Sequence, residues 1–559
     1  MKLKKLLVIF LIINSISLIA QDKLIEGLNQ ELNRTMQAFS KEEIPPYYIS
    51  YSITTIKSNN IRAKNGEILA NNSDKKRILD IDLRVGDYSF DNTHIIRGNP
   101  IQFNFGSGAT EIPLDDNIPA IRNIIWNNTE RRFRAAVERY KKAKTNQAVK
   151  VSEEDKSPDF SKEKPVEYYG KSKDFDLNVE DWSNKLKQLS ALFMDYPWVL
   201  NHSVSLTTEV QEKVFINTEG SKLVWYETNC RLFVLASTKA DDGMSLPLYR
   251  SYFSFTPDGL PDINKIENDI KEVVDLLKQL KDAPLAETFS GPAILSGESS
   301  GVFFHEIFGH RVEGHREKDP NSSQTFKNSV GKPIMPDFIS IVFDPTKEKL
   351  NGTDLSGFYY YDNEGVKSQR VVTVENGIFK NFLMSRSPIE NFPNSNGHGR
   401  SQAGYNPVSR QSNLIVEANK KVSKDSLIKL LKTEIKKQGK EYGLLFDEVS
   451  GGFTFTNRVI PNAFNVTPLV VYKVFPDDRP NQLVRGVDLI GTPLTTFKNI
   501  IAAADDMGIF NGICGAESGG VPVSACSPSL LISTIEVQKK QKSQAKPPIL
   551  LPPSVIGKY

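Results

Sequence analysis

Cysteine, histidine and long apolar runs are all scarce in this chain of 559 residues. It contains three cysteines and six histidines, and so few thiols cannot build the disulfide framework typical of small secreted domains. After residue 20, no apolar stretch is long enough to cross a membrane as a helix. The shares of hydrophobic (39%) and charged (25%) residues are ordinary and indicate a globular chain with room for two or more domains.

The first twenty residues have the composition of a secretory signal. Three lysines precede an apolar stretch, and cleavage is expected after Ala20. A single membrane anchor is the alternative, but Asn14 and Ser15 interrupt the stretch, which is also short for a spanning helix. We therefore expect an exported protein, periplasmic or secreted, that has no stable membrane insertion after cleavage of the signal peptide (residues 1–20).

The remaining chain has little net charge. Loss of the signal removes three lysines and no acid, which brings the formal charge from +3 to about zero. A balanced charge gives no electrostatic attraction to nucleic acid, so we expect no nucleic-acid partner. The basic residues between Arg131 and Arg139 lie in a helical pattern and are interpreted as a solvated face.

Periodicity along the chain predicts an α+β fold with two domains. Helical and strand-like segments alternate up to Pro284 and predict an N-terminal sheet-and-helix domain of α/β type, residues 21–284. Within it, the polar residues 145–165 are expected to form an exposed loop. Residues 285–540 are expected to form a mostly β domain that carries a metal-binding helix, and a Pro-rich tail follows at 541–559.

The segment from His305 to His310 is the strongest candidate for a reactive site. It places two imidazoles and the carboxylate of Glu306 within six residues. Neutral imidazole is the commonest metal ligand, and a neighbouring carboxylate can act as general base toward a metal-bound water. The segment therefore predicts a zinc hydrolase site. The alternative is a buried helix that carries two histidines without a metal.

The spacing of these histidines imposes a condition on the helix. Zinc-protease helices place their ligands at i and i+4, whereas here the second histidine stands at i+5, about 140° around a regular helix. Both imidazoles can reach one metal only if the helix is distorted or ends between them, and Gly309 permits such a distortion. Ser299 or Ser300 is expected to cap the start of this helix.

Five motifs, in order, resemble the TldD/PmbA family of metallopeptidases. They are Gly301–His310 with Glu313-Gly314, Tyr361–Gly365 leading into Arg370–Gly377, Gly397–Arg400, Gly486–Thr492, and Gly512–Gly515 with Ser518–Val523. The N-terminal half matches only in general character. In this family, TldD-type chains carry the His-Glu motif, whereas PmbA-type chains lack it and act as partners. The sequence is therefore similar to the catalytic type.

The resemblance implies a zinc site, one ion per chain, formed by His305, His310 and Cys514, with Glu306 as general base. Zinc accepts imidazole and thiolate together, and a catalytic site keeps one position open. The resemblance also implies that unfolded or extended peptides are hydrolysed in a cavity enclosed by two subunits. The expected partner is a second copy or a PmbA-like subunit. Pairing of the peptide as an added strand would explain tolerance of different sequences.

Several nearby residues have alternative roles. Glu313 either orients a ligand histidine or is an ordinary surface acid. His315 is a spare ligand, a substrate contact or a surface residue. Arg400 either contacts the peptide or an oxyanion from a loop, or is solvated in a turn. Cys526 is inert and buried, binds metal, or pairs with Cys514 in a disulfide that would remove the thiolate from the site.

Two other functions remain open from the sequence. A non-catalytic partner subunit of a heterodimeric peptidase would keep the fold and only shape another chain's cavity, but the intact His305, Glu306 and Cys514 argue against it. A metal-dependent amidase or deacylase could use the same chemistry on another substrate. The better-known family members are cytoplasmic, whereas the signal predicts that this chain is exported.

Overall fold

The computed structural model describes residues 23–96, 109–148, 155–456, 464–491 and 493–540. The expected signal and the Pro-rich tail lie outside these ranges. Within them, no helix has both the length and the apolar composition needed to cross a membrane.

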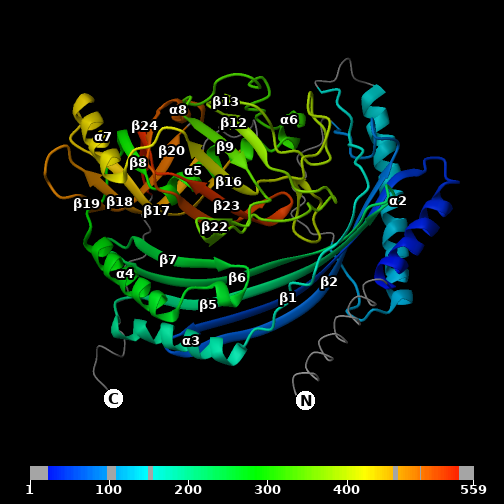
Figure 1. Ribbon diagram of the computed structural model, residues 1–559, viewed down its shortest axis with the longest axis horizontal. Helices are drawn as coiled ribbons and strands as arrows, with labels where there is room; N and C mark the ends of the chain where they lie inside the picture. Colours follow the sequence, from blue (N-terminus) through cyan, green and yellow to red (C-terminus); the bar gives the residue numbers. More distant parts are fainter. Residues whose placement is uncertain (1–22, 97–108, 149–154, 457–463, 492, 541–559) are drawn as a thin grey trace.

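The N-terminal half is built on one long, curved sheet with the strand order β3-β2-β1-β5-β6-β4, in which β7 also pairs with β6 (Figure 1). The β1–β2 hairpin turns at Asn65-Gly66, where both residues have positive φ (52° and 77°), as a two-residue hairpin turn requires. The strands are β1 (Pro46–Lys64), β2 (Glu67–Val85), β3 (Thr110–Glu111), β4 (Glu167–Tyr169), β5 (Asn201–Asn217), β6 (Lys222–Lys239) and β7 (Ser245–Ser254).

Helices cover one face of this sheet in two groups. A helix at 23–39 and α2 (Ile118–Ala148) pack on β1 and β2, while α3 (Val179–Ala191) packs on β1 and β5 and α4 (Ile263–Asp282) packs on β6 and β7. The opposite face of β6 and β7 lies against the second half of the chain (Figure 1). Two short 3-10 turns complete this half, η1 (Leu192–Asp195) and η2 (Pro257–Gly259).

The second half contains two further sheets with helix α5 (Gly297–Ile307) packed between them. One sheet has the order β17-β8-β24-β20-β18-β19, with β21 beside β24. Its strands are β8 (Phe289–Leu295), β17 (Gly443–Thr454), β18 (Phe464–Val474), β19 (Gln482–Val484), β20 (Val487–Gly491), β21 (Ile500–Ala503) and β24 (Leu530–Lys539). Helix α7 (Lys424–Lys437) covers its outer face, and α8 (Pro493–Lys498) lies near β24.

The other sheet has the order β13-β12-β9-β16-β23-β22, so that β22 is an edge strand. Its strands are β9 (Ile339–Phe343), β12 (Val371–Glu375), β13 (Ile378–Phe379), β16 (Asn413–Ala418), β22 (Gly508–Ala516) and β23 (Gly519–Ser527). The remaining short elements are η3 (Gly309–Arg311), α6 (His315–Lys318) and the strand pairs β10 (Lys349–Leu350) with β11 (Thr353–Asp354) and β14 (Gly399–Arg400) with β15 (Val408–Ser409). The expected α+β fold class, with a mostly β second half around one buried helix, is confirmed.

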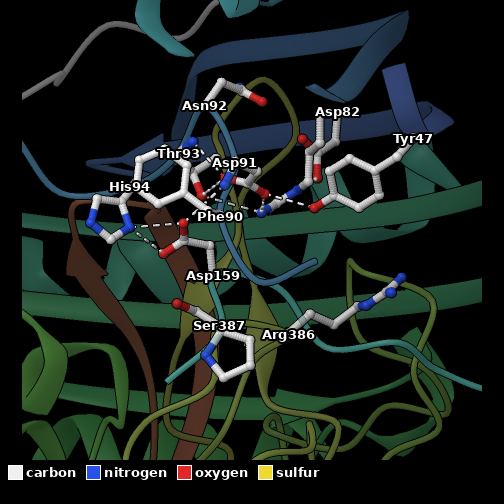
Figure 2. A network of polar contacts seen from close by, with 12 residues as sticks. Tyr47, Asp82, Phe90, Asp91, Asn92, Thr93, His94, Asp159, Arg386 and Ser387 are labelled. Carbon is white, nitrogen blue, oxygen red and sulfur yellow. Dashed lines mark hydrogen bonds and ion pairs between the residues drawn. The ribbon is translucent and has the colours of Figure 1, made fainter. Parts of the chain in front are cut away.

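One expectation is wrong: residues 145–165 are not an exposed loop throughout. Asp159 and Phe160 are buried. The Asp159 carboxylate lies 2.9 Å from Nδ1 of His94 (Figure 2), and the Phe160 ring centre lies 3.9 Å from Cζ of Arg386. The polar composition of the segment predicted contact with solvent, but partners from distant parts of the chain bury these two side chains.

Candidate metal centre

Helix α5 carries the first histidine of the cluster and ends before the second. Its last residue is Ile307, and the chain then tightens into the 3-10 turn η3, which contains His310. This change of winding brings the two imidazole rings to a centroid separation of 5.0 Å. The expected break between His305 and His310 is confirmed.

Gly309 is needed at this break because of a close approach. It is not among the glycines with positive φ, but a Cβ at this position would collide with the side chain of Gln411. The Gln411 amide donates from Nε2 to the carbonyl oxygen of His305 at 3.2 Å. The missing side chain therefore lets a buried amide hold the end of α5.

The cap of α5 differs from the expectation. Ser296, rather than Ser299 or Ser300, accepts a hydrogen bond from the backbone N–H of Ser299. The Ser296 hydroxyl also donates to the carbonyl oxygen of Asp447 in β17 at 2.6 Å. Because the helix begins at Gly297, Ser296 precedes it, whereas Ser299 and Ser300 lie inside its first turn.

Three ligand atoms meet at the end of α5. One atom each from His305, His310 and Cys514 lies within 4.8 Å of the others, and all three residues are buried. Sγ of Cys514 is 3.4 Å from Nε2 of His310. Ligand atoms around a tetrahedral zinc ion, with metal–ligand distances of about 2.0–2.3 Å, are separated by roughly 3.5 Å. The donor set and its spacing therefore fit zinc.

The charges around Cys514 favour its thiolate form. Burial alone would raise the pKa of the Cys514 thiol, but His310 and His305 hold that pKa well below its usual value. The thiolate is the form that binds a metal. Glu306 follows the first histidine directly, and burial raises its pKa. Its Oε2 is buried and has no hydrogen-bond partner among the described residues.

Glu313 lies behind His310 and is not a surface acid. Its Oε2 is 3.3 Å from Nδ1 of His310 and 2.8 Å from Nε of Arg316. Burial opposes ionisation, but Arg316 and His310 lower the pKa of Glu313 to about 2. A ligand histidine commonly donates its second ring nitrogen to a carboxylate. This geometry favours the orienting role.

Arg400 and His315 lie outside the ligand group. Arg400 is 5% exposed and donates from Nη1 to the carbonyl oxygen of Gln411 at 2.6 Å, so it is not solvated. It is absent from the lining of the cavity above the ligands, and its hydrogen bond to Gln411 connects it to the carbonyl oxygen of His305. Nε2 of His315 lies 2.6 Å from Oε1 of Glu517.

Cys526 is separated from Cys514 along the β22–β23 pair. Cys514 lies opposite Val521, whereas Cys526 lies opposite Ile509. Both thiols are free, and Cys526 is fully buried in a small apolar cluster. The structure therefore contains no disulfide between them, and it places Cys526 outside the ligand group.

A cavity of about 1490 Å³ opens over the ligands and is lined by both halves of the chain. Alternate residues of two strands of the N-terminal sheet face it: Arg231, Phe233 and Leu235 from β6, and Pro247, Tyr249 and Ser251 from β7. From the second half, α5, β17 and the whole of β22 contribute. The sequence did not identify the β6 and β7 residues. The alternation of side chains along these strands was the available signal. It predicts two different faces of the sheet, but it does not predict which part of the chain packs against each face.

Comparison with known proteins agrees with this geometry. Residues 288–539 match the family model of the PmbA/TldA metallopeptidase C-terminal domain. The chain is 29% identical to a metalloprotease of Methanothermobacter thermautotrophicus over 60% of its own length and 69% of that protein. It is 24% identical to a zinc metalloprotease TldD homolog of Saccharolobus solfataricus over 65% of its own length and 77% of that protein.

Other similarities are partial or concern the fold. Alignments with metalloproteases of Archaeoglobus fulgidus and Methanocaldococcus jannaschii span 58% and 66% of those proteins. The crystal structure of TldE from Thermococcus kodakarensis has a similar fold, with a TM-score of 0.58. The match covers 91% of this chain and 100% of that chain at 13% identity, so it concerns the fold alone.

Proposed function

Because the chain belongs to the TldD/PmbA family of metallopeptidases, we propose that it is a zinc-dependent peptidase acting on unfolded or extended peptides. The observation that carries the proposal is the convergence of His305, His310 and Cys514 beneath a large cavity, with the unpartnered carboxylate oxygen of Glu306 beside them. This arrangement has the ligands, the base and the substrate space that peptide hydrolysis needs.

The protein residues have separate tasks in this reaction. A zinc ion held by the three ligands would supply a Lewis acid that polarises the scissile carbonyl and lowers the pKa of water. Glu306 is placed to take a proton from the attacking water and to return it to the leaving amine. Glu313 holds Nδ1 of His310, which leaves Nε2 toward Cys514.

The position of β22 supports an extended peptide as substrate. This strand lies at the edge of its sheet, and all of it lines the cavity. Unpaired backbone groups at a sheet edge can bind an extended chain as an added strand. Such a strand enters the space between the two halves more easily than a folded protein does.

Two finer parts of the proposal rest on other grounds. We propose export to the periplasm or the medium from the composition of the first twenty residues. We also propose, from the resemblance to the TldD/PmbA family, that the chain works as a dimer, with itself or with a sister subunit. Cell fractionation and light scattering of the purified protein would test these two points.

The experiment that tests the activity is casein cleavage by the zinc-loaded chain and its Glu306→Gln variant, with zinc content measured in parallel. We expect about one zinc per chain in both proteins and a loss of cleavage by roughly 100- to 10,000-fold in the variant. Equal cleavage by the two proteins would contradict the assignment of Glu306. A chain that binds no zinc would contradict the metal site itself.

A further inference from the structure

Most charged groups that line the cavity have a partner of opposite charge. Three cations in the wall form the ion pairs Arg250–Glu448 (2.9 Å), Lys424–Asp506 (3.1 Å) and Arg316–Glu517 (3.1 Å). Arg231 differs from them. In the part of the chain that the structure describes, no carboxylate lies within 4.0 Å of its guanidinium, and its Nη2 has no hydrogen-bond partner.

Arg231 is held in place by strands of both halves. Its Nη1 donates to the hydroxyl of Ser251 at 2.8 Å and to the carbonyl oxygen of Asn511 at 2.9 Å. Its Cζ lies 5.6 Å from the centre of the Phe253 ring. The guanidinium is therefore fixed between β6, β7 and the edge strand β22.

The free energy of this arrangement favours an anion. Burial lowers the pKa of the Arg231 guanidinium, and the nearby Tyr249 only partly opposes that effect. An arginine side chain nevertheless stays charged in proteins. A partly buried cation without an acid loses hydration and gains no ion pair in return. A carboxylate that entered with a ligand would supply the missing partner.

The contact with Asn511 fixes the distance between Arg231 and the ligand Cys514 along β22. Asn511 precedes Cys514 by three positions on β22, which corresponds to about 10 Å along a strand. An extended peptide of about three residues covers the same distance. Because Arg231 already occupies the Asn511 carbonyl, it blocks the edge of β22 at that point. A strand added to this edge would end beside the guanidinium.

We infer that Arg231 determines specificity by binding a carboxylate of the peptide substrate about three residues from the scissile bond. The inference rests on the proposed peptidase function and adds a substrate class to it. The carboxylate comes either from the C-terminus of the peptide or from an Asp or Glu side chain, and a guanidinium binds both. A C-terminal carboxylate would give short C-terminal products of about three residues.

Binding by an inactive protein tests the inference without turnover. Fluorescent peptides would be titrated into zinc-loaded Glu306→Gln protein: one sequence as a free acid and as a C-terminal amide, and a series of amides of that sequence with one Asp at varied internal positions. We expect the free acid or one Asp peptide to bind about 10- to 100-fold more tightly than the plain amide. Which of the two gains affinity identifies the source of the carboxylate.

Three further substitutions in the Glu306→Gln background separate the role of Arg231 from general charge effects. Arg231→Met should bind the carboxylate-bearing peptide and the plain amide with about equal affinity. Arg231→Lys should retain part of the preference for the carboxylate. Lys424→Gln is the matched control, because it removes a cavity cation that already has the partner Asp506. It should leave the preference unchanged.

The outcomes separate this inference from the proposed function. Equal binding of acid, Asp and amide peptides, or a preference that survives in Arg231→Met, would overturn the role of Arg231. In that case the peptidase function would still stand if the corresponding protein with Glu306 in place cleaves the amide peptide. Absence of binding and of cleavage for all peptides would overturn both.

Discussion

The two thiols on β22 and β23 have different surroundings although their strands are neighbours. Cys514 meets two histidines, whereas Cys526 meets apolar side chains. We expect Cys514→Ser to weaken zinc binding by more than about 100-fold, because a first ligand matters more than the outer partners of ligands, whose loss already costs 10- to 100-fold. Competition with a zinc-binding dye would measure the change.

The matched control is Cys526→Ser. We expect zinc affinity near that of the parent protein but a loss of about 1–3 kcal/mol in the free energy of unfolding, since a hydroxyl replaces a buried thiol. If both variants lost zinc equally, or only Cys526→Ser did, the ligand set would be wrong.

His398 predicts a dependence of stability on pH. Burial lowers the pKa of its ring to about 3, against about 6.5 in an unfolded chain. As the pH falls below 6.5, the unfolded state therefore binds the proton first, and stability is lost progressively toward pH 3. At pH 5 this loss is about 2 kcal/mol relative to pH 8.

Urea unfolding at pH 8 and pH 5 would measure this effect in the parent protein and in His398→Gln. The variant should lose about 2 kcal/mol less than the parent protein between the two pH values. An identical loss in both proteins would show that His398 does not contribute to the pH dependence.

At the scale of elements, the N-terminal cap of α5 links the stability of this helix to the metal site. Ser296 caps α5, and Ser423 caps α7 in the same manner. Replacement of either serine by alanine should cost about 1 kcal/mol of stability. Only Ser296→Ala should also weaken zinc binding, because α5 carries His305. Thermal unfolding and zinc titration of both variants would test this. Equal zinc affinities in the two variants would contradict a specific link between the cap of α5 and the metal site.

Helix α5 also shows how far the sequence alone reaches. The i+5 spacing of His305 and His310 predicted a break in the helix between them, and the structure has this break. The prediction was possible because it depends only on the geometry of one short segment. The third ligand lies 204 residues beyond His310, and only the family resemblance pointed to Cys514. The cap is Ser296 because the helix begins at Gly297, a boundary that the sequence pattern placed a few residues too late.

The lining of the cavity was missed for a related reason. Alternation along β6 predicts two different faces, but the partner of each face is a property of the tertiary structure. Arg231 therefore looked like an ordinary strand residue. Similarly, Asp159 and Phe160 stand in a polar segment, and only their partners from far along the chain explain why they are buried.

At the scale of the whole molecule, Arg386 joins the two halves. Its side chain is fully buried, Nη2 lies 2.7 Å from Oε1 of Glu219, and Cζ lies over the rings of Phe160 and Tyr48. We expect Arg386→Met to cost about 3–5 kcal/mol, because it leaves a buried carboxylate without its cation. Denaturant unfolding would measure the cost.

Arg479 provides the control for this substitution. It forms an ion pair with Asp477 at a site where its side chain is 49% exposed, so Arg479→Met should leave the stability close to that of the parent protein. Equal effects of the two substitutions would mean that the contact through Arg386 does not hold the halves together.

The distance along the chain between the metal ligands has a consequence for biosynthesis. A ribosome completes the N-terminal sheet first, then the two histidines, and, 204 residues after His310, adds Cys514. Domains generally fold in that order during translation. A nascent or truncated polypeptide therefore lacks the thiolate and the edge strand that carries it. Under the proposed function, peptide hydrolysis would begin only after Cys514 and β22 are in place, when the earlier segments of the chain have already folded.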